Sequence, residues 1–357
     1  MKKMIILGIE TSCDETSASI VNEGKNGQCE ILSNIVHSQI SEHVDYGGVV
    51  PEIAARSHIQ NIDKVVEKSI TESGINLKDL DAIAVTSGPG LKGGLIVGVT
   101  FAKAMASVLK IPILGINHLE GHALTIRMVE NILFPYLLLL VTGGHTQLLI
   151  VKNVDDYERL GTTIDDALGE AYDKVSKSLN HGYPGGPVVE KMAQKSNLNN
   201  IKFPRPLINS GDLNFSFSGL KTAVRREINK SKPLDNQTAY NICAEFQDSV
   251  IDVILSKLSL AISLFKNKYG IQNPNVVLAG GVAANKKIFS SIKKVSEGEK
   301  FNISVAPQHL CTDNAAMIAW SGIKRLRKEI KSTPIVIKPR WPLDIGNDVE
   351  SEVDIKV

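Results

Sequence analysis

Residues 137–151, LLLLVTGGHTQLLIV, constrain the fold of this chain more than any other stretch, because two apolar runs flank one polar turn. Neither run alternates with polar residues, so we expect two strands that are buried on both faces, as in the central sheet of an α/β protein. The turn holds Gly143 and Gly144, and adjacent glycines let backbone N–H groups approach an anion closely. Thr142 and Thr146 add hydroxyl groups to this turn. The stretch predicts a buried hairpin whose turn is either a plain connection or an anion-binding loop.

A second hairpin of similar outline is predicted at residues 4–21, where two apolar runs flank the polar segment ETSCDETS. Its turn carries the carboxylates of Asp14 and Glu15 in place of glycines. Carboxylates in such a place handle protons or bind a metal ion, although Asp is also a common turn former. Two hairpins of similar outline indicate an internal duplication, with two lobes whose turns face a shared cleft.

Each half of the chain also contains an apolar strand followed by a glycine-rich loop and a helix. The strands are predicted at residues 82–86 and 275–279, and the loops after them read SGPGLKGG and GGVAAN. Such a loop presents free N–H groups at a helix start, which suits a phosphate, but the first loop lacks the Gly-Lys-Ser/Thr of a Walker A motif. These units predict a duplicated nucleotide-binding fold. We expect an N-terminal lobe at 1–125, a C-terminal lobe with an inserted helical segment at 126–335, and a tail at 336–357.

Two of the predicted helices carry clusters of basic residues. The first helix follows the segment FSFSG, and the second spans residues 315–331. Their basic residues are Lys221, Arg225 and Arg226 in the first helix, and Lys324, Arg325, Arg327, Lys328 and Lys331 in the second. Such faces are usually solvated, and with a formal net charge of +2 any contact with RNA must come from local patches like these. Further helices are expected from Pro51 onward and over residues 235–266.

The chain shows no sign of a membrane or export segment. No run approaches the ~18 consecutive apolar residues of a membrane span. The start, MKKMIILGIETSCDE, reaches an acidic residue too soon for a signal peptide, and it is not a long transit segment. The 4 cysteines share neither a metal-binding nor a redox spacing, so we expect reduced thiols. These features predict a cytoplasmic protein.

His118 and His122, in the segment HLEGH, are spaced as two ligands on one face of a helix. A peptidase of the HExxH type needs a glutamate directly after the first histidine. Here Glu120 lies two positions after His118, about 200° around the helix, and so faces away from the pair. A third metal ligand must come from elsewhere. Asp313, just before the last predicted helix, is either that ligand or the cap of the helix.

Ten segments of the chain have the character of family motifs: GIETSCDETS, YGGVVPEIAAR, TSGPGLKGGLIVG, HLEGH, LVTGGHTQL, DDALGEAYDK, YPGGP, FSFSGLKT, LAGGVAANK and CTDNAAM. Together they resemble the TsaD family of tRNA threonylcarbamoyladenosine transferases, once called O-sialoglycoprotein endopeptidases. The segments run in order from residue 8 to residue 317, so the resemblance covers nearly the whole chain.

The resemblance implies a fold, a reaction and partners. The fold is the α/β fold of actin, Hsp70 and the sugar kinases, with two duplicated RNase H-like lobes around a nucleotide cleft. The reaction moves a threonylcarbamoyl group from threonylcarbamoyl-AMP to the exocyclic amine of the adenosine beside the anticodon of tRNA. The expected partners are tRNA, an enzyme that makes the donor, and TsaB-like and TsaE-like accessory subunits of a bacterial-type complex, with no membrane.

The resemblance also assigns site residues by motif. His118, His122 and Asp313 are the expected ligands of one divalent metal ion, iron or zinc. The expected contacts to the substrate adenylate are Leu140, Val141, Thr142, Gly143, Gly144, Asp173, Gly186 and Asn285. Asp14 and Glu15 line the same cleft and are the candidates for proton handling. Two positions depart from the family's usual residues, because Thr142 and Ala283 each replace a serine; the first keeps a hydroxyl and the second loses it.

Three other functions are weighed against this one. A metallopeptidase of glycoproteins would need a base beside the metal and usually export, and the sequence offers neither. An ATP-dependent kinase of the same fold would leave the histidine pair without a purpose. A non-catalytic scaffold would be favoured by loss of the metal ligands, and they are present.

Overall fold

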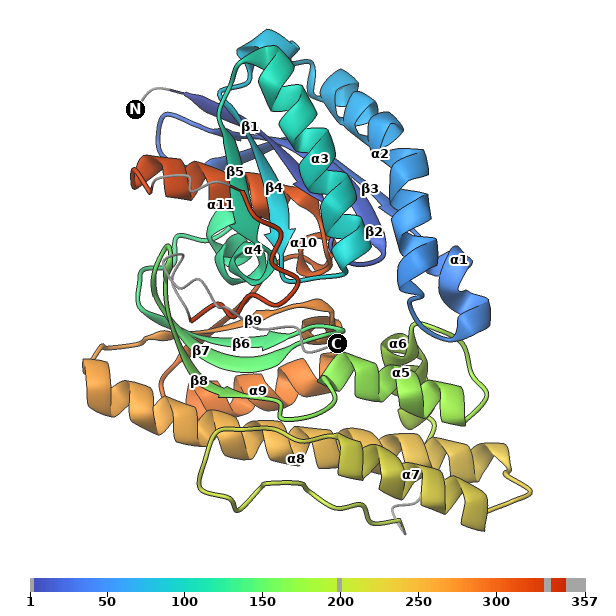
Figure 1. Ribbon diagram of the computed structural model, residues 1–357. Helices are drawn as coiled ribbons and strands as arrows, with labels where there is room; N and C mark the ends of the chain where they lie inside the picture. Colours follow the sequence, from blue (N-terminus) through green and yellow to red (C-terminus); the bar gives the residue numbers. More distant parts are fainter. Residues whose placement is uncertain (1–2, 198–200, 331–334, 345–357) are drawn as a thin grey trace, which may run out of the picture.

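The computed structural model describes residues 3–197, 201–330 and 335–344, and its first lobe is built on a five-stranded sheet (Figure 1). Three strands, β1 (Met4–Glu10), β2 (Glu15–Glu23) and β3 (Cys29–Ser38), form an antiparallel meander. Two more, β4 (Ala82–Gly88) and β5 (Ile113–Asn117), add in parallel on the other side of β1. The strand order is β3-β2-β1-β4-β5.

The second lobe repeats this arrangement. Strands β6 (Tyr136–Val141), β7 (Thr146–Asn153) and β8 (Asp156–Thr162) form the meander. Strands β9 (Asn275–Ala279) and β10 (Asn302–Val305) add in parallel beside β6, giving the order β10-β9-β6-β7-β8. Both sheets therefore share one topology, which confirms the predicted α/β fold and its internal duplication.

Strand β6 lies between two apolar cores, which is why its run of leucines does not alternate with polar residues. Leu137 and Leu139 face the core that contains the helices of the second lobe. Leu138 and Leu140 face a core that also includes residues of the first sheet, such as Ile6. Neighbouring residues of a strand point to opposite faces, so both faces must be apolar where both are covered.

Two long helices, α2 (Pro51–Ser73) and α3 (Lys92–Leu109), cover the outer face of the first sheet (Figure 1). The first begins at Pro51, as predicted, because proline is tolerated in the first turn. By length and composition alone, α3 is the one helix among the described residues that could span a membrane. Its residues Val99 and Ala102 pack in the core of the first lobe, which is how a core helix of a globular protein behaves.

Two further helices, α4 (His118–Thr125) and α11 (Ala315–Arg327), lie between the two sheets (Figure 1). Helix α11 packs against β1 and β2 of the first lobe, although its residues fall in the segment 126–335. Gly8 permits this packing, because a Cβ there would lie 2.2 Å from the carbonyl oxygen of Ala315. Helix α11 thus belongs to the second lobe by its position in the sequence but packs on the sheet of the first lobe.

Helices α5 to α9 belong to the second lobe, and the 34-residue α8 runs along the far side of its sheet (Figure 1). Their bounds are α5 (Leu168–Ser178), α6 (Gly185–Ala193), α7 (Ser218–Lys230), α8 (Asn236–Tyr269) and α9 (Lys286–Gly298). The short helices of the described residues are α1 (Ile40–His43), α10 (Gln308–Cys311) and four 3-10 turns, at Val44–Tyr46, Leu77–Asp79, Ile126–Met128 and Gly281–Ala284.

Part of the expected tail at 336–357 packs against the first lobe. The backbone N–H of Lys338 donates to the carbonyl of Ser87 at 2.8 Å, and the side-chain amide of Asn117 donates to the carbonyl of Trp341 at 3.1 Å. Residues 345–357 lie outside the described part of the chain.

Candidate functional site

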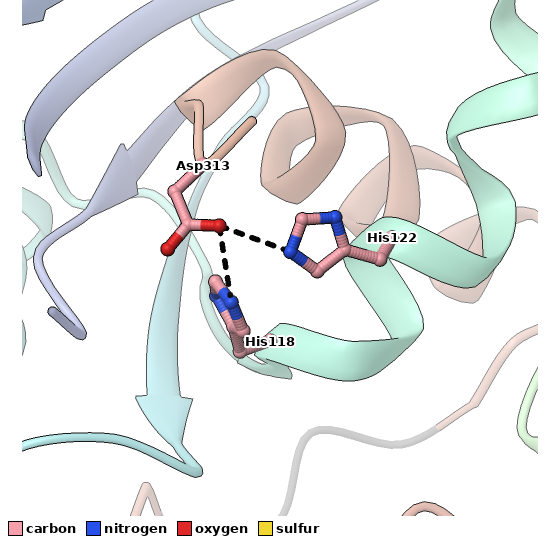
Figure 2. Close-up of side chains that lie close together, drawn as sticks. All are labelled: His118, His122 and Asp313. Carbon is pink, nitrogen blue, oxygen red and sulfur yellow. Dashed lines mark hydrogen bonds and ion pairs between the residues drawn. The ribbon is translucent and has the colours of Figure 1, made fainter. Parts of the chain in front are cut away.

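His118 and His122 lie one turn apart on α4, with their rings on the same side of the helix (Figure 2). The helix begins at His118 because the side chain of Asn117 caps it, accepting from the N–H of Leu119 at 2.9 Å. The two ring centroids are 4.7 Å apart and the ring planes are nearly perpendicular. The spacing of the two histidines on one helix is therefore enough to point both imidazoles in the same direction.

Asp313 meets both imidazoles although it is about 190 residues away in the chain (Figure 2). Its Oδ1 lies 3.0 Å from Nε2 of His122 and 3.5 Å from Nε2 of His118. The cap of α11 is Asn314, whose side chain accepts from the N–H of Met317 at 3.2 Å, so the carboxylate of Asp313 is not used as a cap. The predicted convergence of the three side chains is observed.

Glu10 supports the histidine pair from the end of β1. Its Oε2 lies 2.9 Å from Nδ1 of His118, and the carboxylate also accepts from the hydroxyl of Thr86 and the N–H of Ser12. A carboxylate on one ring nitrogen fixes the tautomer, so that the other nitrogen is free to bind a metal. Glu10 is not among the site residues predicted from the sequence, although an acidic residue at the end of an apolar strand could have indicated it.

The charges of this cluster are strongly coupled. Burial alone would lower the pKa of His118, but the carboxylates of Asp313 and Glu10 outweigh burial and raise it well above its usual value. Burial would raise the pKa of Asp313, but the two histidines hold it well below its usual range. The carboxylates of Asp313 and Glu10 thus favour positive charge next to them, which either a proton on His118 or a bound cation supplies.

The donor set fits a divalent metal ion. Nitrogen atoms from His118 and His122 and an oxygen from Asp313 all lie within 4.8 Å of one another. Two imidazoles and one carboxylate suit iron and zinc, and three protein ligands leave positions open for a substrate. His145 lies nearby without joining the set: burial, then the positive charges of His118 and His122, lower its pKa to about 4.

Glu120 does not face the cluster of His118, His122 and Asp313. It is fully buried, and its Oε2 accepts from Nε of Arg325 at 2.9 Å. The same guanidinium also pairs with Asp155. The glutamate between the two histidines therefore faces away from them, as predicted, and is part of an internal ion pair.

The acidic turn between β1 and β2 lies close to this cluster. Burial, and then the negative charges of Asp313 and Asp14, raise the pKa of Glu15 well above its usual value. Asp14 is buried, and its Oδ2 accepts a hydrogen bond of 3.4 Å from the hydroxyl of Tyr183, which comes from the second lobe. Tyr183 was not selected from the sequence. Its signal was an aromatic residue that opens the segment YPGGP.

The glycine turn after β6 offers backbone rather than side-chain contacts. Leu140 and Val141 are buried in the cores, so a ligand can reach only their backbone. The Oγ1 of Thr142 accepts from the N–H of Gly144 at 3.3 Å and shapes the turn. Gly143 and Gly144 are exposed, and a Cβ on either would meet no atom within 4 Å. The turn is open to a ligand on its outer side.

Two glycines outside the turn allow other segments to approach it closely. A Cβ on Gly280 would lie 2.3 Å from the carbonyl oxygen of Val141, and one on Gly169 would lie 2.7 Å from that of Thr142. Gly280 also has a φ of +91°, which L side chains rarely adopt. The absence of a side chain at Gly280 and Gly169 thus lets the loop after β9 and the start of α5 pack against the turn, and only the tertiary contacts reveal this role.

Three other residues are expected to contact the substrate: Asp173, Gly186 and Asn285. Asp173 and Asn285 form hydrogen bonds within the protein, and Gly186 borders open space. The Oδ1 of Asp173 accepts from the N–H of Gly185 at 2.7 Å, and burial raises the pKa of Asp173 to about 6. A Cβ on Gly186 would meet no atom within 4 Å. Asn285 caps α9, accepting from the N–H of Ile288 at 3.0 Å, and its amide donates to Gln247 at 2.9 Å. Its side chain is thus engaged at both ends.

The two basic helices differ in how their charges are used. On α11, Arg325 is buried, and Lys324 and Arg327 both pair with Glu23. On α7, Lys221 pairs with Asp166, whereas Arg225 and Arg226 are exposed. Most of the basic character of α11 is therefore used inside the molecule, and α7 keeps two exposed guanidinium groups.

Solved structures resemble this chain in fold. HypF from T. kodakarensis superposes with a TM-score of 0.58 at 15% identity, covering 92% of this chain and 48% of that chain. A full-length HypF in a phosphate- and nucleotide-bound form superposes with a TM-score of 0.57 at 12% identity, covering 93% of this chain and 48% of that chain. At such identities the likeness concerns the fold alone.

Sequence comparison is more specific. Two relatives, from Brucella suis and Brucella anthropi, are each named tRNA N6-adenosine threonylcarbamoyltransferase. Each is 51% identical over 343 residues, which is 96% of this chain and 96% of the relative. The family model for TsaD, described as tRNA N6-adenosine threonylcarbamoyltransferase, matches residues 30–320. With that match and these relatives, the chain belongs to the TsaD family.

Proposed function

We propose that this protein transfers the threonylcarbamoyl group from threonylcarbamoyl-AMP to the exocyclic amine of the adenosine beside the anticodon of tRNA. The observation that carries the proposal is the convergence of His118, His122 and Asp313 beside an acidic turn and an open glycine turn. The family relationship supports the same reaction.

One divalent metal ion per subunit, iron or zinc, is proposed to bind to His118, His122 and Asp313. The donor types and their mutual distances support this assignment. A metal ion held there would polarise the carbonyl of the transferred group and stabilise charge on the leaving AMP. Glu10 would hold His118 in the tautomer whose Nε2 is free to bind the ion.

The adenylate is proposed to lie against the glycine turn. The N–H groups of Gly143 and Gly144 would donate to a phosphate oxygen, because the outer side of this turn is open. The carboxylate of Asp173 would accept from a hydroxyl of the ligand, and with a pKa of about 6 it is ionised at neutral pH. Gly186 leaves space beside Asp173 for the ligand.

The transfer requires one proton to be removed. A bond forms between the amine nitrogen of the adenosine and the carbamoyl carbon, the bond from that carbon to the phosphate oxygen breaks, and the amine loses a proton. Asp14 is the proposed acceptor, with its carboxylate oriented by Tyr183. Glu15, whose raised pKa favours the protonated form, is the proposed donor to a developing negative charge.

The rival functions are less well supported. A peptidase of the HExxH type needs a base beside its histidines, and Glu120 is instead paired with Arg325. A kinase would use the fold but would leave the cluster of His118, His122 and Asp313 without a role. The transfer reaction gives every one of these groups a function.

The proposed partners are tRNA, an enzyme that makes threonylcarbamoyl-AMP, and TsaB-like and TsaE-like accessory subunits. The exposed Arg225 and Arg226 of α7 are candidates for phosphate contacts with tRNA. A tRNA substrate and a donor made from threonine both fit a cytoplasmic location, which we propose for this protein.

A reconstitution experiment tests the function. Purified protein with tRNA, threonine, bicarbonate and ATP is expected to produce no modified nucleoside. Addition of threonylcarbamoyl-AMP, or of the enzyme that makes it, together with the accessory subunits, is expected to produce threonylcarbamoyladenosine, detected by nucleoside analysis of the tRNA. Cleavage of a glycoprotein without any transfer to tRNA would contradict the proposal.

A further inference from the structure

A chain of buried polar side chains runs through the first lobe behind the acidic turn, outside the site described above. Its members are Thr16 on β2, Gln39 just before α1, His43 on α1 and His58 on α2. All four have 0% of their surface exposed. Buried polar groups destabilise a protein unless they are hydrogen-bonded, so the partners of each group decide what this chain can do.

The contacts form one continuous path. At one end, Nδ1 of His43 lies 3.4 Å from the backbone nitrogen of Val50. Nε2 of the same ring lies 3.3 Å from Oε1 of Gln39, whose Nε2 lies 3.2 Å from Nδ1 of His58. At the other end, Nε2 of His58 lies 3.0 Å from the carbonyl oxygen of Cys13.

The two ends fix the direction of every hydrogen bond between them. The backbone N–H of Val50 can only donate and the carbonyl of Cys13 can only accept. A neutral imidazole has one donor and one acceptor, so His43 accepts at Nδ1 and donates at Nε2. The Oε1 of Gln39 then accepts from His43, and its NH2 group donates to Nδ1 of His58. His58 therefore accepts at Nδ1 and donates at Nε2.

Two further observations support a neutral His58. The hydroxyl of Thr16 lies 2.8 Å from its Nδ1 and can donate to that nitrogen when the ring is neutral and protonated at Nε2. Burial also lowers the pKa of His58 below its usual value. A Cβ on Gly94 would lie 3.0 Å from the ring, so the start of α3 packs directly against the imidazole.

This chain of hydrogen bonds ends on the backbone around Asp14. His58 holds the carbonyl of Cys13, which belongs to the peptide group before Asp14. The backbone N–H of Gln39 donates to the carbonyl of Asp14 at 3.0 Å, and that carbonyl belongs to the peptide group after it. With both flanking peptide groups held, the φ and ψ angles of Asp14 are fixed, and so is the direction of its Cα–Cβ bond.

We propose that His58 is a positioning residue for the transfer reaction, which holds the acidic turn of Asp14 and Glu15 through a one-directional chain of hydrogen bonds shared with Gln39 and His43. The inference rests on the proposed roles of Asp14 and Glu15 in proton handling. His58 itself touches neither the metal ligands nor the glycine turn in the contacts that define it; it acts through the backbone of Cys13.

A matched pair of variants separates positioning from general stability. His58→Gln keeps a donor near the place of Nε2, whereas His58→Asn keeps only an acceptor near Nδ1. In the full-length protein with its partners, His58→Asn is expected to lower kcat about 100-fold, as a misplacement of about 1 Å does. The KM for tRNA and the metal content should not change, and His58→Gln should stay within a few-fold of the unmodified protein. Equal activity of the two variants at equal Tm would overturn the proposal.

Imidazole tautomers give a readout that does not depend on activity. Nitrogen-15 NMR of the full-length protein with labelled histidine should show His43 and His58 as neutral rings protonated at Nε2. In Gln39→Glu, a carboxylate would face Nδ1 of His58 and accept only, so this ring should become protonated at Nδ1 as well. Protonation of His58 at Nδ1 alone in the unmodified protein would overturn the assigned chain. An Asp14→Asn variant with unchanged kcat would instead refute the proposed role of Asp14 while the tautomers still report on the chain.

Discussion

Replacing Glu10 by glutamine tests whether the carboxylate next to His118 prepares the proposed metal site. Glu10 is 1% exposed, and its two oxygens accept from the N–H of Ser12, the hydroxyl of Thr86 and Nδ1 of His118. Glutamine has nearly the same size but replaces one oxygen by an NH2 group. The change therefore alters hydrogen bonding with little change in volume.

Both orientations of the new amide conflict with a neighbour. If the NH2 group faces Nδ1 of His118, that nitrogen must accept, and the proton moves to Nε2, where it blocks metal binding. If the NH2 group faces the N–H of Ser12, which lies 2.5 Å from Oε1, two donors meet in a buried place. A buried donor without an acceptor costs about 1–3 kcal/mol.

We therefore expect metal affinity to fall about 10- to 100-fold in Glu10→Gln, the range found when such supporting groups are removed. This corresponds to about 1.4–2.8 kcal/mol. Competition of the protein with a chelator of known affinity measures the change, for zinc and iron separately. Transfer activity at limiting metal should fall in parallel and recover in part at high metal concentration.

Glu23→Gln is the matched control for Glu10→Gln. Glu23 is also a buried carboxylate of the first lobe, at 2% exposure, but it pairs with Lys324 and Arg327 and not with the proposed metal ligands. It should lose stability without a change in metal affinity. An unchanged metal affinity in Glu10→Gln, at a Tm comparable to that of the control, would refute the reasoning.

Three further predictions follow from the site. His122→Ala should lower metal content and transfer activity together, measured by elemental analysis and nucleoside analysis; loss of activity at full metal content would argue against a ligand role. Gly144→Val should abolish transfer with little change in Tm, because a Cβ there meets no atom within 4 Å and a side chain would only block a phosphate; an unfolded variant would mean that the glycine is structural. With the pKa of Asp173 near 6, adenylate binding should weaken as pH falls below about 6, when the carboxylate takes up a proton, and Asp173→Asn should remove this dependence in calorimetric titrations.

Local patterns in the sequence were enough for most of the elements. The apolar runs beside Gly143 and Gly144 became β6 and β7, and Pro51 marks the start of α2. The similar outline of the two hairpins indicated the duplication that the two sheets display. These features depend on residues close in sequence, where strand and helix periodicity operate directly.

The partners of charged and amide side chains could be predicted less well from the sequence. The basic residues of α11 looked like a solvated or RNA-binding face, but Arg325 is buried against Glu120 and Asp155. Asn285 caps α9 and bonds to Gln247, whereas its expected contact with the adenylate stays a prediction. A charge or amide in the sequence does not reveal whether its partner is solvent, a ligand or another element.

The sequence by itself determined that His118 and His122 share a face of one helix and that Glu120 turns away, because 3.6 residues per turn fix both directions. Only the tertiary structure decided that Asp313 meets the pair, that Glu10 stands behind it, and that the chain from His58 ends at the acidic turn. The physical reason is that these contacts join segments far apart in the chain. They arise from the packing of α4 and α11 between two sheets, which no local periodicity specifies.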